Sequence, residues 1–319
     1  MIAPVLEIAG LTVRYGRRLA AWAVDLTLGP GEVLGLVGES GAGKSTVGRA
    51  VVGLLPEPGR VEAGAIRLDG RDLVGLSPAE MRRLRGADIG LIPQDPVAAL
   101  NPAFRIGLQA TDALRTHRGL PRQAADAEMA RRFDDLGMPD PADLLQRYPH
   151  ELSGGMRQRV LIAMAFSCEP KLVIADEPTT ALDVTTQAQI LRLLADLQAR
   201  HRVATLFVTH DLGVVAHLAQ RVGVMYAGCL VESAPTDQLF RGPAHPYTQG
   251  LLAQVLRADV RAEASAALEG LMPVLTAPPR ACPFRERCPK RMAACDEVMP
   301  ALREIASGHA VACHLYGAA

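Results

Sequence analysis

The chain has 319 residues, which is enough for about two domains with a sizeable core and excludes a small scaffold held together by disulfides. Lys and Arg together number 34, and Asp and Glu together also number 34, so the formal net charge is zero. This balance excludes an overall positive potential that would attract nucleic acid, and it excludes a strongly acidic disordered chain. Hydrophobic residues make up 49% of the chain. No apolar run approaches the roughly 18 to 20 residues needed to cross a bilayer.

The N-terminal 16 residues lack the basic start and long apolar centre of a secretory signal, so we expect a chain that stays in the cytoplasm. Four short apolar runs predict strands that are buried on both faces: Val33–Val37, Ile89–Ile92, Leu172–Ala175 and Val203–Val208. Helical patterns separate these runs, and Thr186–Arg200 places Ile190, Leu193, Leu194 and Leu197 on one face. The pattern predicts an α/β fold with a parallel sheet.

Two regions depart from this alternation. Residues 96–148 show helical periodicity with several Pro and Gly breaks, which predicts a helical insertion between two strands. After about residue 240, prolines interrupt short helices and four of the six cysteines gather. We therefore expect a large domain at 1–240, with a helical subdomain at about 96–165, and a small Cys-containing domain at 241–319.

The segment 38–45, with the sequence GESGAGKS, fits the pattern G-x-x-x-x-G-K-[ST] directly after the predicted strand Val33–Val37. Glycines let successive backbone N–H groups face phosphates, and the following helix N-terminus adds positive potential. Lys44 would reach the β- and γ-phosphates, Ser45 would ligate Mg²⁺, and Thr46 would add a phosphate contact. The predicted phosphate-binding residues are Gly38, Ser40, Gly41, Gly43, Lys44, Ser45 and Thr46.

Two acids follow the predicted strand Leu172–Ala175, at the end where parallel sheets bind their ligands. Asp176 would hold Mg²⁺, directly or through water, and Glu177 would polarise the water that attacks the γ-phosphate. Residues 152–155, Leu-Ser-Gly-Gly, precede a helix-like stretch, so Ser153, Gly154 and Gly155 form a helix N-terminus suited to an anion.

With these motifs in this order, nearly the entire chain resembles the ATP-binding subunits of ABC transporters. The resemblance implies a P-loop ATPase core with a helical signature subdomain. It implies that Gln94 belongs to the glutamine loop and contacts the metal, that Asp183 lies in the loop communicating across a dimer, and that His210 is the switch histidine. Tyr15 resembles the aromatic residue that stacks on adenine, with a core or surface tyrosine as the alternative.

The resemblance also implies a head-to-tail dimer in which residues 153–155 of one chain close on ATP held by the other. Met156 stands where the commonest family signature has Gln. The partners implied are a second ATPase, in this family usually a paralogue, two membrane permeases and an extracytoplasmic binding protein, with no nucleic acid. The chain would then lie at the cytoplasmic face of the cell membrane and couple ATP hydrolysis to transport.

Further features narrow the resemblance to importers of dipeptides and oligopeptides: Asp95-Pro96, Leu100-Asn101-Pro102, Met156-Arg157-Gln158-Arg159 and His245-Pro246-Tyr247-Thr248. An importer of nickel or another metal chelate is the first alternative. A soluble ATPase of this family acting on nucleic acid or ribosomes is the second, against which the balanced charge argues.

The four tail cysteines, Cys282, Cys288, Cys295 and Cys313, are spaced C-x5-C-x6-C-x17-C. In a cytosolic chain such a group suggests a metal site, and the residues leave open an iron–sulfur cluster, a zinc site or free thiols. The family resemblance favours a [4Fe–4S] cluster with a structural or regulatory role. His309 or His314 could replace a ligand, while Cys168 and Cys229 are expected to be buried in the nucleotide-binding domain.

Overall fold

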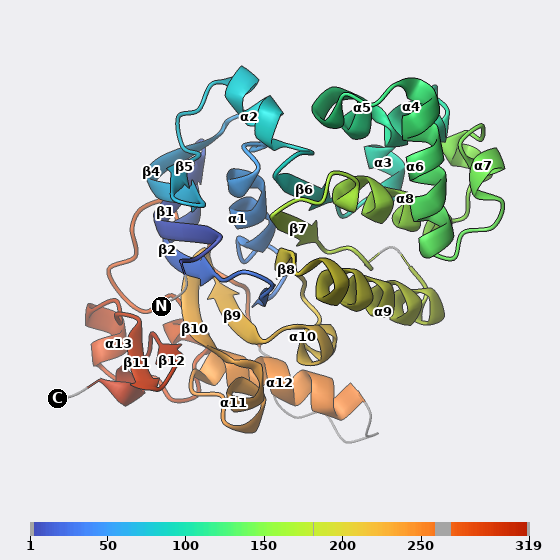
Figure 1. The fold of residues 1–319 in the computed structure, drawn as a ribbon. Helices are drawn as coiled ribbons and strands as arrows, with labels where there is room; N and C mark the ends of the chain where they lie inside the picture. Colours follow the sequence, from blue (N-terminus) through green and yellow to red (C-terminus); the bar gives the residue numbers. More distant parts are fainter. Residues whose placement is uncertain (1–2, 181, 259–268, 318–319) are drawn as a thin grey trace. The chain divides into compact units, whose positions relative to one another are not determined.

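The computed structural model describes residues 3–180, 182–258 and 269–317, and the chain forms two compact units (Figure 1). Unit 1 comprises Met1–Val5, Leu28–Glu32 and Gly75–Leu206. Unit 2 comprises Leu6–Thr27, Val33–Val74 and Phe207–Ala319. Each unit thus collects segments that are far apart in the sequence.

Two parallel strands form the centre of unit 1. Strand β6 (Ile89–Ile92) pairs with β7 (Leu172–Asp176), and Ile92 lies opposite Ala175. Every residue of β7 is buried, as the continuous apolar run predicted. The strand continues one residue further than predicted, to Asp176, and β8 (Ala204–Val208) begins in this unit, one residue later than predicted.

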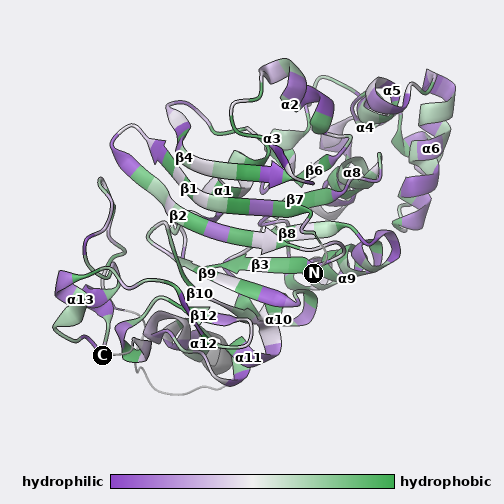
Figure 2. Cartoon of the chain, turned by 60° about the vertical axis from the view of Figure 1, so that its left-hand side comes forward, coloured by the Kyte–Doolittle hydropathy of each residue, from purple (hydrophilic) through white to green (hydrophobic). Residues whose placement is uncertain are grey.

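Helices make up the rest of unit 1, and several of those that form where the sequence predicted a helical insertion pack against α8 (Gly154–Phe166). Helix α6 (Arg122–Asp135) turns Ala125, Met129 and Phe133 inward at helical spacing, and its other face is polar (Figure 2). The predicted helix at 186–200 is α9 (Val184–His201). The remaining helices are α2 (Pro78–Leu84), α3 (Pro96–Ala99), α4 (Ile106–Ala110), α5 (Asp112–Arg118), α7 (Pro141–Leu144) and the short 3₁₀ helix η1 (Pro149–Glu151).

Unit 2 contains two sheets. The first, in the order β2-β1-β4-β5, was not predicted, and its pairs β1–β4 and β4–β5 are antiparallel. Its strands are β1 (Leu6–Tyr15), β2 (Arg18–Leu28), β4 (Gly59–Leu68) and β5 (Arg71–Asp72). In the second, β3 (Val33–Val37) is parallel to β9 (Arg221–Tyr226), and β10 (Cys229–Pro235) continues the sheet in the antiparallel sense. The second sheet of unit 2 is therefore mixed, whereas the sequence pattern predicted a parallel sheet.

The C-terminal residues extend this second sheet of unit 2. Strand β12 (His309–Val311) pairs with β10, placing Val311 opposite Glu232, and β11 (Arg303–Ala306) pairs with β12. The helices of unit 2 are α1 (Lys44–Val51), α10 (Leu212–Leu218), α11 (Thr236–Arg241), α12 (Pro246–Ala258), α13 (Ala294–Glu297) and the 3₁₀ helices η2 (Arg285–Arg287) and η3 (His314–Tyr316). The cysteine-bearing tail thus folds within the same unit as the predicted phosphate-binding loop.

Among the described residues, none of the helices combines the length and the hydrophobicity that crossing a bilayer requires.

Candidate functional site

The predicted phosphate-binding loop of unit 2 connects β3 to α1, and its backbone passes too close to its neighbours for side chains at two positions. Gly38 has φ +150° and Gly43 has φ +104°, where L side chains are rare. A Cβ at Gly38 would lie 2.2 Å from Met225 O, and one at Gly43 would lie 2.3 Å from Ala20 O. The glycines of the motif are therefore required by this conformation.

Gly43 is also the N-cap of α1, and no side chain caps this helix. The first N–H groups of such a helix are suited to bind an anion. Lys44 begins the helix with its side chain buried, and its Nζ donates to Gly38 O at 2.7 Å and to Glu39 O at 3.0 Å. Ser45 and Thr46 follow in the first turn, both half-buried. This cradle of glycine backbone, helix N-terminus and lysine fits the phosphates of ATP.

Tyr15 and His210 also lie in unit 2. Tyr15 ends β1 and is half-buried against Gly59, where a Cβ would lie 2.3 Å from Tyr15 Cε1. His210 is exposed and directly follows Thr209, whose N–H donates to Leu36 O of β3 at 3.1 Å. His210 therefore follows a residue bonded to the strand that enters the phosphate-binding loop.

In unit 1, Asp176 is the last residue of β7 and is 4% exposed, while Glu177 is 9% exposed. Glu177 has φ +47°, a left-handed backbone conformation that costs energy in a non-glycine residue and is typical of functional sites. Its Oε2 accepts hydrogen bonds from Gln94 Nε2 at 3.2 Å and from Thr180 Oγ1 at 3.0 Å. The structure thus joins Gln94 to Glu177, and it adds Thr180, which the motifs did not point to.

These unit 1 groups suit a magnesium ion, since carboxylate and amide oxygens are hard ligands. Gln94 uses its amide nitrogen on Glu177, which leaves Oε1 as the atom that can contact a metal. Asp176 offers a carboxylate at the end of a buried parallel strand.

Ser153, Gly154, Gly155 and Asp183 line one cavity of about 490 Å³ in unit 1. Ser153 caps α8, its Oγ accepting from Met156 N at 3.3 Å, and Asp183 caps α9, its Oδ1 accepting from Thr186 N at 3.0 Å. The backbone N–H of Thr186 lowers the pKa of Asp183. Met156, the departure from the commonest family signature, lines the same cavity. The predicted signature and dimer-loop residues are therefore neighbours.

The predicted metal site of the tail is not supported. Among the residues that the structure describes, no group of three or more His, Cys, Asp or Glu side chains is placed to hold a metal ion. Cys282 and Cys295 are buried and joined by a backbone bond from Cys282 N to Cys295 O at 3.0 Å, whereas Cys288 and Cys313 are half-buried. None of the six cysteines forms a disulfide, and burial raises the pKa of Cys282 to about 11.

The two histidines suggested as replacement ligands bind elsewhere. His309 Nε2 lies 2.7 Å from Glu232 Oε1, a fully buried carboxylate, and His314 Nε2 lies 2.8 Å from Val298 O. Cys168 and Cys229 are buried, as expected, and burial raises the pKa of Cys229 to about 12. These groups therefore contribute to packing in the structure described.

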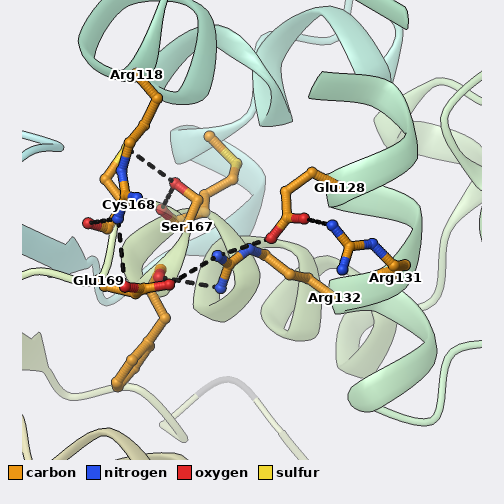
Figure 3. Close-up of polar contacts among 9 residues, drawn as sticks. Arg118, Glu128, Arg131, Arg132, Ser167, Cys168 and Glu169 are labelled. Carbon is orange, nitrogen blue, oxygen red and sulfur yellow. Dashed lines mark hydrogen bonds and ion pairs between the residues drawn. The ribbon is translucent and has the colours of Figure 1, made fainter. Parts of the chain in front are cut away.

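A polar cluster that the sequence did not indicate lies between α5, α6 and the end of α8 in unit 1 (Figure 3). Arg132 Nη2 lies 2.9 Å from Glu128 and 3.7 Å from Glu169, and Arg118 Nη2 donates to Cys168 O at 2.7 Å and pairs with Glu169 at 3.4 Å. Arg131 also binds Glu128. Each arginine of the cluster pairs with an acid, and the cluster links α5, α6 and the segment that follows α8.

Sequence reasoning also missed the surroundings of Glu39, which lies inside the phosphate-binding loop. Its carboxylate binds Arg287 of the tail, and its N–H donates to Tyr247 Oη at 2.8 Å. A signal did exist: an acid inside an anion-binding loop is unfavourable unless a cation accompanies it. No pattern in the sequence identifies which of the many arginines that cation is.

Comparisons with known proteins agree with these motifs. The family described as ABC transporter matches residues 22–180, and the oligopeptide/dipeptide transporter C-terminal region matches residues 231–295. The chain is 46% identical over 316 residues to the dipeptide transport ATP-binding protein DppD of Bacillus subtilis, covering 98% of this chain and 94% of that protein. It is 43% identical over 314 residues to DppD of Escherichia coli, covering 97% and 96%.

A putative peptide import ATP-binding protein of Brucella ovis is 45% identical over 326 residues, covering 97% of this chain and 96% of that protein. Among solved structures, CbiO1 of Clostridium perfringens, part of an ABC transporter complex, has a TM-score of 0.65 and 24% identity. That match covers 81% of this chain and 96% of CbiO1, and it supports the fold.

Proposed function

The chain belongs to the ATP-binding proteins of ABC transporters, which are ATPases, and from this premise we propose that it hydrolyses MgATP to drive the import of dipeptides or oligopeptides. The observation that carries the cargo class is the match of residues 231–295 to the C-terminal region of oligopeptide/dipeptide transporters. Identity of 46% to a dipeptide transport protein over nearly the whole chain supports it.

Each predicted site residue receives a role in this proposal. The loop 38–43 and the N-terminus of α1 bind the phosphates through backbone N–H groups, and Lys44 exchanges its bonds to Gly38 O and Glu39 O for phosphate oxygens. Ser45, Asp176 and Gln94 are the side chains that would hold Mg²⁺, which when bound neutralises phosphate charge. Tyr15 stacks on the adenine ring.

Glu177 carries the hydrolytic step in this proposal. Its carboxylate accepts a hydrogen bond from the attacking water and orients it toward the γ-phosphate, while Gln94 and Thr180 hold the carboxylate in place. His210 contacts the γ-phosphate. Ser153, Gly154, Gly155 and Asp183 face the nucleotide held by a second ATPase subunit, so that one chain supplies half of each site.

The proposed assembly places the chain at the cytoplasmic face of the membrane, beside a paralogous ATPase, two permeases and an extracytoplasmic binding protein. Residues 1–240 form its nucleotide-binding domain, with the helical subdomain at about 96–165, and residues 241–319 form the extension. The two matched regions, 22–180 and 231–295, support this division.

Purification of the assembly from detergent-solubilised membranes through a tag on this chain tests the proposal. Mass spectrometry should identify two permeases, a second ATPase and a retained peptide. Recovery of permeases with bound nickel or a metal chelate, and no peptide, would assign a metal cargo to the importer instead of a peptide. Ribosomal or DNA-associated proteins without any permease would contradict the transport role.

The iron–sulfur cluster remains a separate hypothesis for the tail. It rests on the four cysteines of the tail and on the family resemblance; burial is the main cause of the raised pKa of Cys282, and Cys295, Cys313 and Cys288 raise this pKa further. Anaerobic purification followed by iron and sulfide analysis tests it. Zinc at one equivalent without iron would favour a zinc site, and metal-free protein would leave four thiols.

A further inference from the structure

Glu39 is the acidic residue of the phosphate-binding loop, and all of its polar groups are bonded. Its N–H donates to Tyr247 Oη at 2.8 Å, and its carbonyl accepts from Lys44 Nζ at 3.0 Å. Its carboxylate accepts two bonds from Arg287, Nη1 to Oε2 and Nη2 to Oε1, both at 2.8 Å. This two-pronged geometry is the strongest form of the Arg–carboxylate pair.

Arg287 comes from the C-terminal tail, in η2 between Cys282 and Cys288, and its side chain is only 5% exposed. Its guanidinium is fixed from other sides as well. Nη1 donates to Tyr226 Oη at 3.3 Å, Nε donates to Glu269 O at 3.0 Å, and the Tyr226 ring centre lies 5.6 Å from Cζ. The hydrogen bonds with Glu39 raise the pKa of Arg287, so its guanidinium is charged at neutral pH.

A second contact joins the tail to the same part of the molecule. Met272 Cε lies 3.4 Å from the position of a Cβ at Gly41, and Met272 Sδ accepts from Ala227 N at 3.3 Å. Three residues after Met272, Leu275 O accepts a hydrogen bond from Leu19 N at 2.7 Å. The tail therefore packs on the phosphate-binding loop through both a charged and an apolar side chain.

The charge of Glu39 makes this pairing relevant to ligand binding. A carboxylate within a loop that receives a triphosphate repels it, because charges a few ångströms apart interact strongly when partly shielded from water. Arg287 offsets that charge and holds the loop residue in one position. Lysine could supply the charge but not the planar two-pronged bond.

We propose that Arg287 is a positioning residue for nucleotide binding, which holds Glu39 and neutralises its charge so that the cysteine-bearing tail contributes to the ATP affinity of the phosphate-binding loop. This inference rests on the proposed function, in that the loop must bind MgATP. The tail then contributes to nucleotide binding through Arg287, and this role does not depend on whether its cysteines bind a metal.

Fluorescence titration of the full chain with trinitrophenyl-ATP and Mg²⁺ tests the proposal. Arg287→Gln should raise the dissociation constant about tenfold, the size expected for loss of charge-assisted bonds. Because Glu39→Gln removes the exposed negative charge, the double variant should recover to within about threefold of the parent, a non-additive result. Amide exchange at residues 39–43 should accelerate in Arg287→Gln.

Arg285→Gln is the matched control, since Arg285 lies in the same 3₁₀ helix but bonds to Cys282 O and pairs with Glu286 and Asp296 within the tail. It should bind the probe as the parent does. Lys44→Ala serves as the reference for a damaged loop. If the parent and Lys44→Ala bind equally, the loop is not the nucleotide site, and the proposed function is overturned together with this inference.

If Lys44→Ala weakens binding but Arg287→Gln does not, only the present inference is overturned. The same holds if the effects of Glu39→Gln and Arg287→Gln simply multiply in the double variant. Should Arg287→Gln fail to fold, Arg287→Lys decides the question. It keeps the charge without the two-pronged bond, so an intermediate loss of affinity supports the inference and unchanged affinity overturns it.

Discussion

Helices α1 and α8 both begin at glycine-rich segments that the sequence marks as anion sites, yet their N-termini are built differently. The N-cap of α1 is Gly43, which has a left-handed backbone and offers no side-chain cap. The N-cap of α8 is Ser153, whose hydroxyl accepts a hydrogen bond from Met156 N and so satisfies one N–H group of the first turn. The first terminus therefore has no side-chain cap for its N–H groups, whereas the second is capped by its own serine.

The largest effect is expected at Glu177, the acid proposed to orient the attacking water. Glu177→Gln keeps the shape of the side chain but removes its charge, so hydrolysis by the purified transporter should fall about 10²- to 10⁴-fold, the usual contribution of a general base. Nucleotide should still bind and accumulate in a closed dimer. Steady-state phosphate release and retained radiolabelled ATP measure the two effects.

Glu169→Gln is the control for this experiment, because Glu169 also has a left-handed backbone, with φ +54°, but pairs with Arg118 and is largely exposed. Turnover in Glu169→Gln should equal that of the parent. Parent-like hydrolysis in Glu177→Gln would remove Glu177 from the proposed role.

The next largest effect is the difference in stability loss when a glycine at the N-terminus of α1 or of α8 is replaced by alanine. Gly43→Ala should destabilise the chain by about 3 kcal/mol or more, because its Cβ would meet Ala20 O at 2.3 Å in a left-handed conformation. Gly154→Ala should be tolerated in stability, since the nearest atom to its Cβ, Leu182 Cδ2, is 3.7 Å away and Ala favours a helix. Chemical denaturation of both variants checks this, and equal losses would contradict the comparison.

A smaller effect should follow from removal of the α8 cap. Ser153→Ala should cost about 1 kcal/mol of stability, the usual value for loss of an N-cap hydroxyl. Ser153→Asp should restore most of it, because a carboxylate also caps and favours the N-terminal end of a helix. Urea denaturation of the three chains at one pH gives the difference, and an unchanged midpoint in Ser153→Ala would show that the cap contributes nothing.

The smallest effect concerns pH. The Thr186 N–H lowers the pKa of Asp183 below its ordinary value of 3.8, so the charged form is favoured in the folded chain. This contribution is complete above the unfolded pKa and is lost as the pH falls through the folded pKa. The acid-side decrease in melting temperature should therefore be shallower in Asp183→Asn than in the parent, as scanning calorimetry at pH values from neutral to acidic would show.

Local sequence patterns predicted much of the fold because the strands concerned are buried on both faces. Ile89–Ile92 and Val33–Val37 have the expected limits, since continuous apolar runs are legible without knowledge of their neighbours. The sheet formed by β1, β2, β4 and β5 was missed. In β1 and β4 many positions are only half-buried or exposed, so neither a continuous apolar run nor a clean alternation marks them.

The candidate site shows the same division. Sequence alone singled out the predicted phosphate-binding loop, the acids Asp176 and Glu177 and the Ser153 segment, because each is a contiguous motif whose spacing indicates its chemistry. Only the tertiary structure decided that Gln94 and Thr180 donate hydrogen bonds to Glu177 and that Arg287 binds Glu39. The same holds for the four tail thiols, which are not placed as a metal-binding group in the part of the chain that the structure describes. Glu39 and Arg287 are 248 residues apart, and a pairing over that distance is determined by how the chain packs, not by any local pattern.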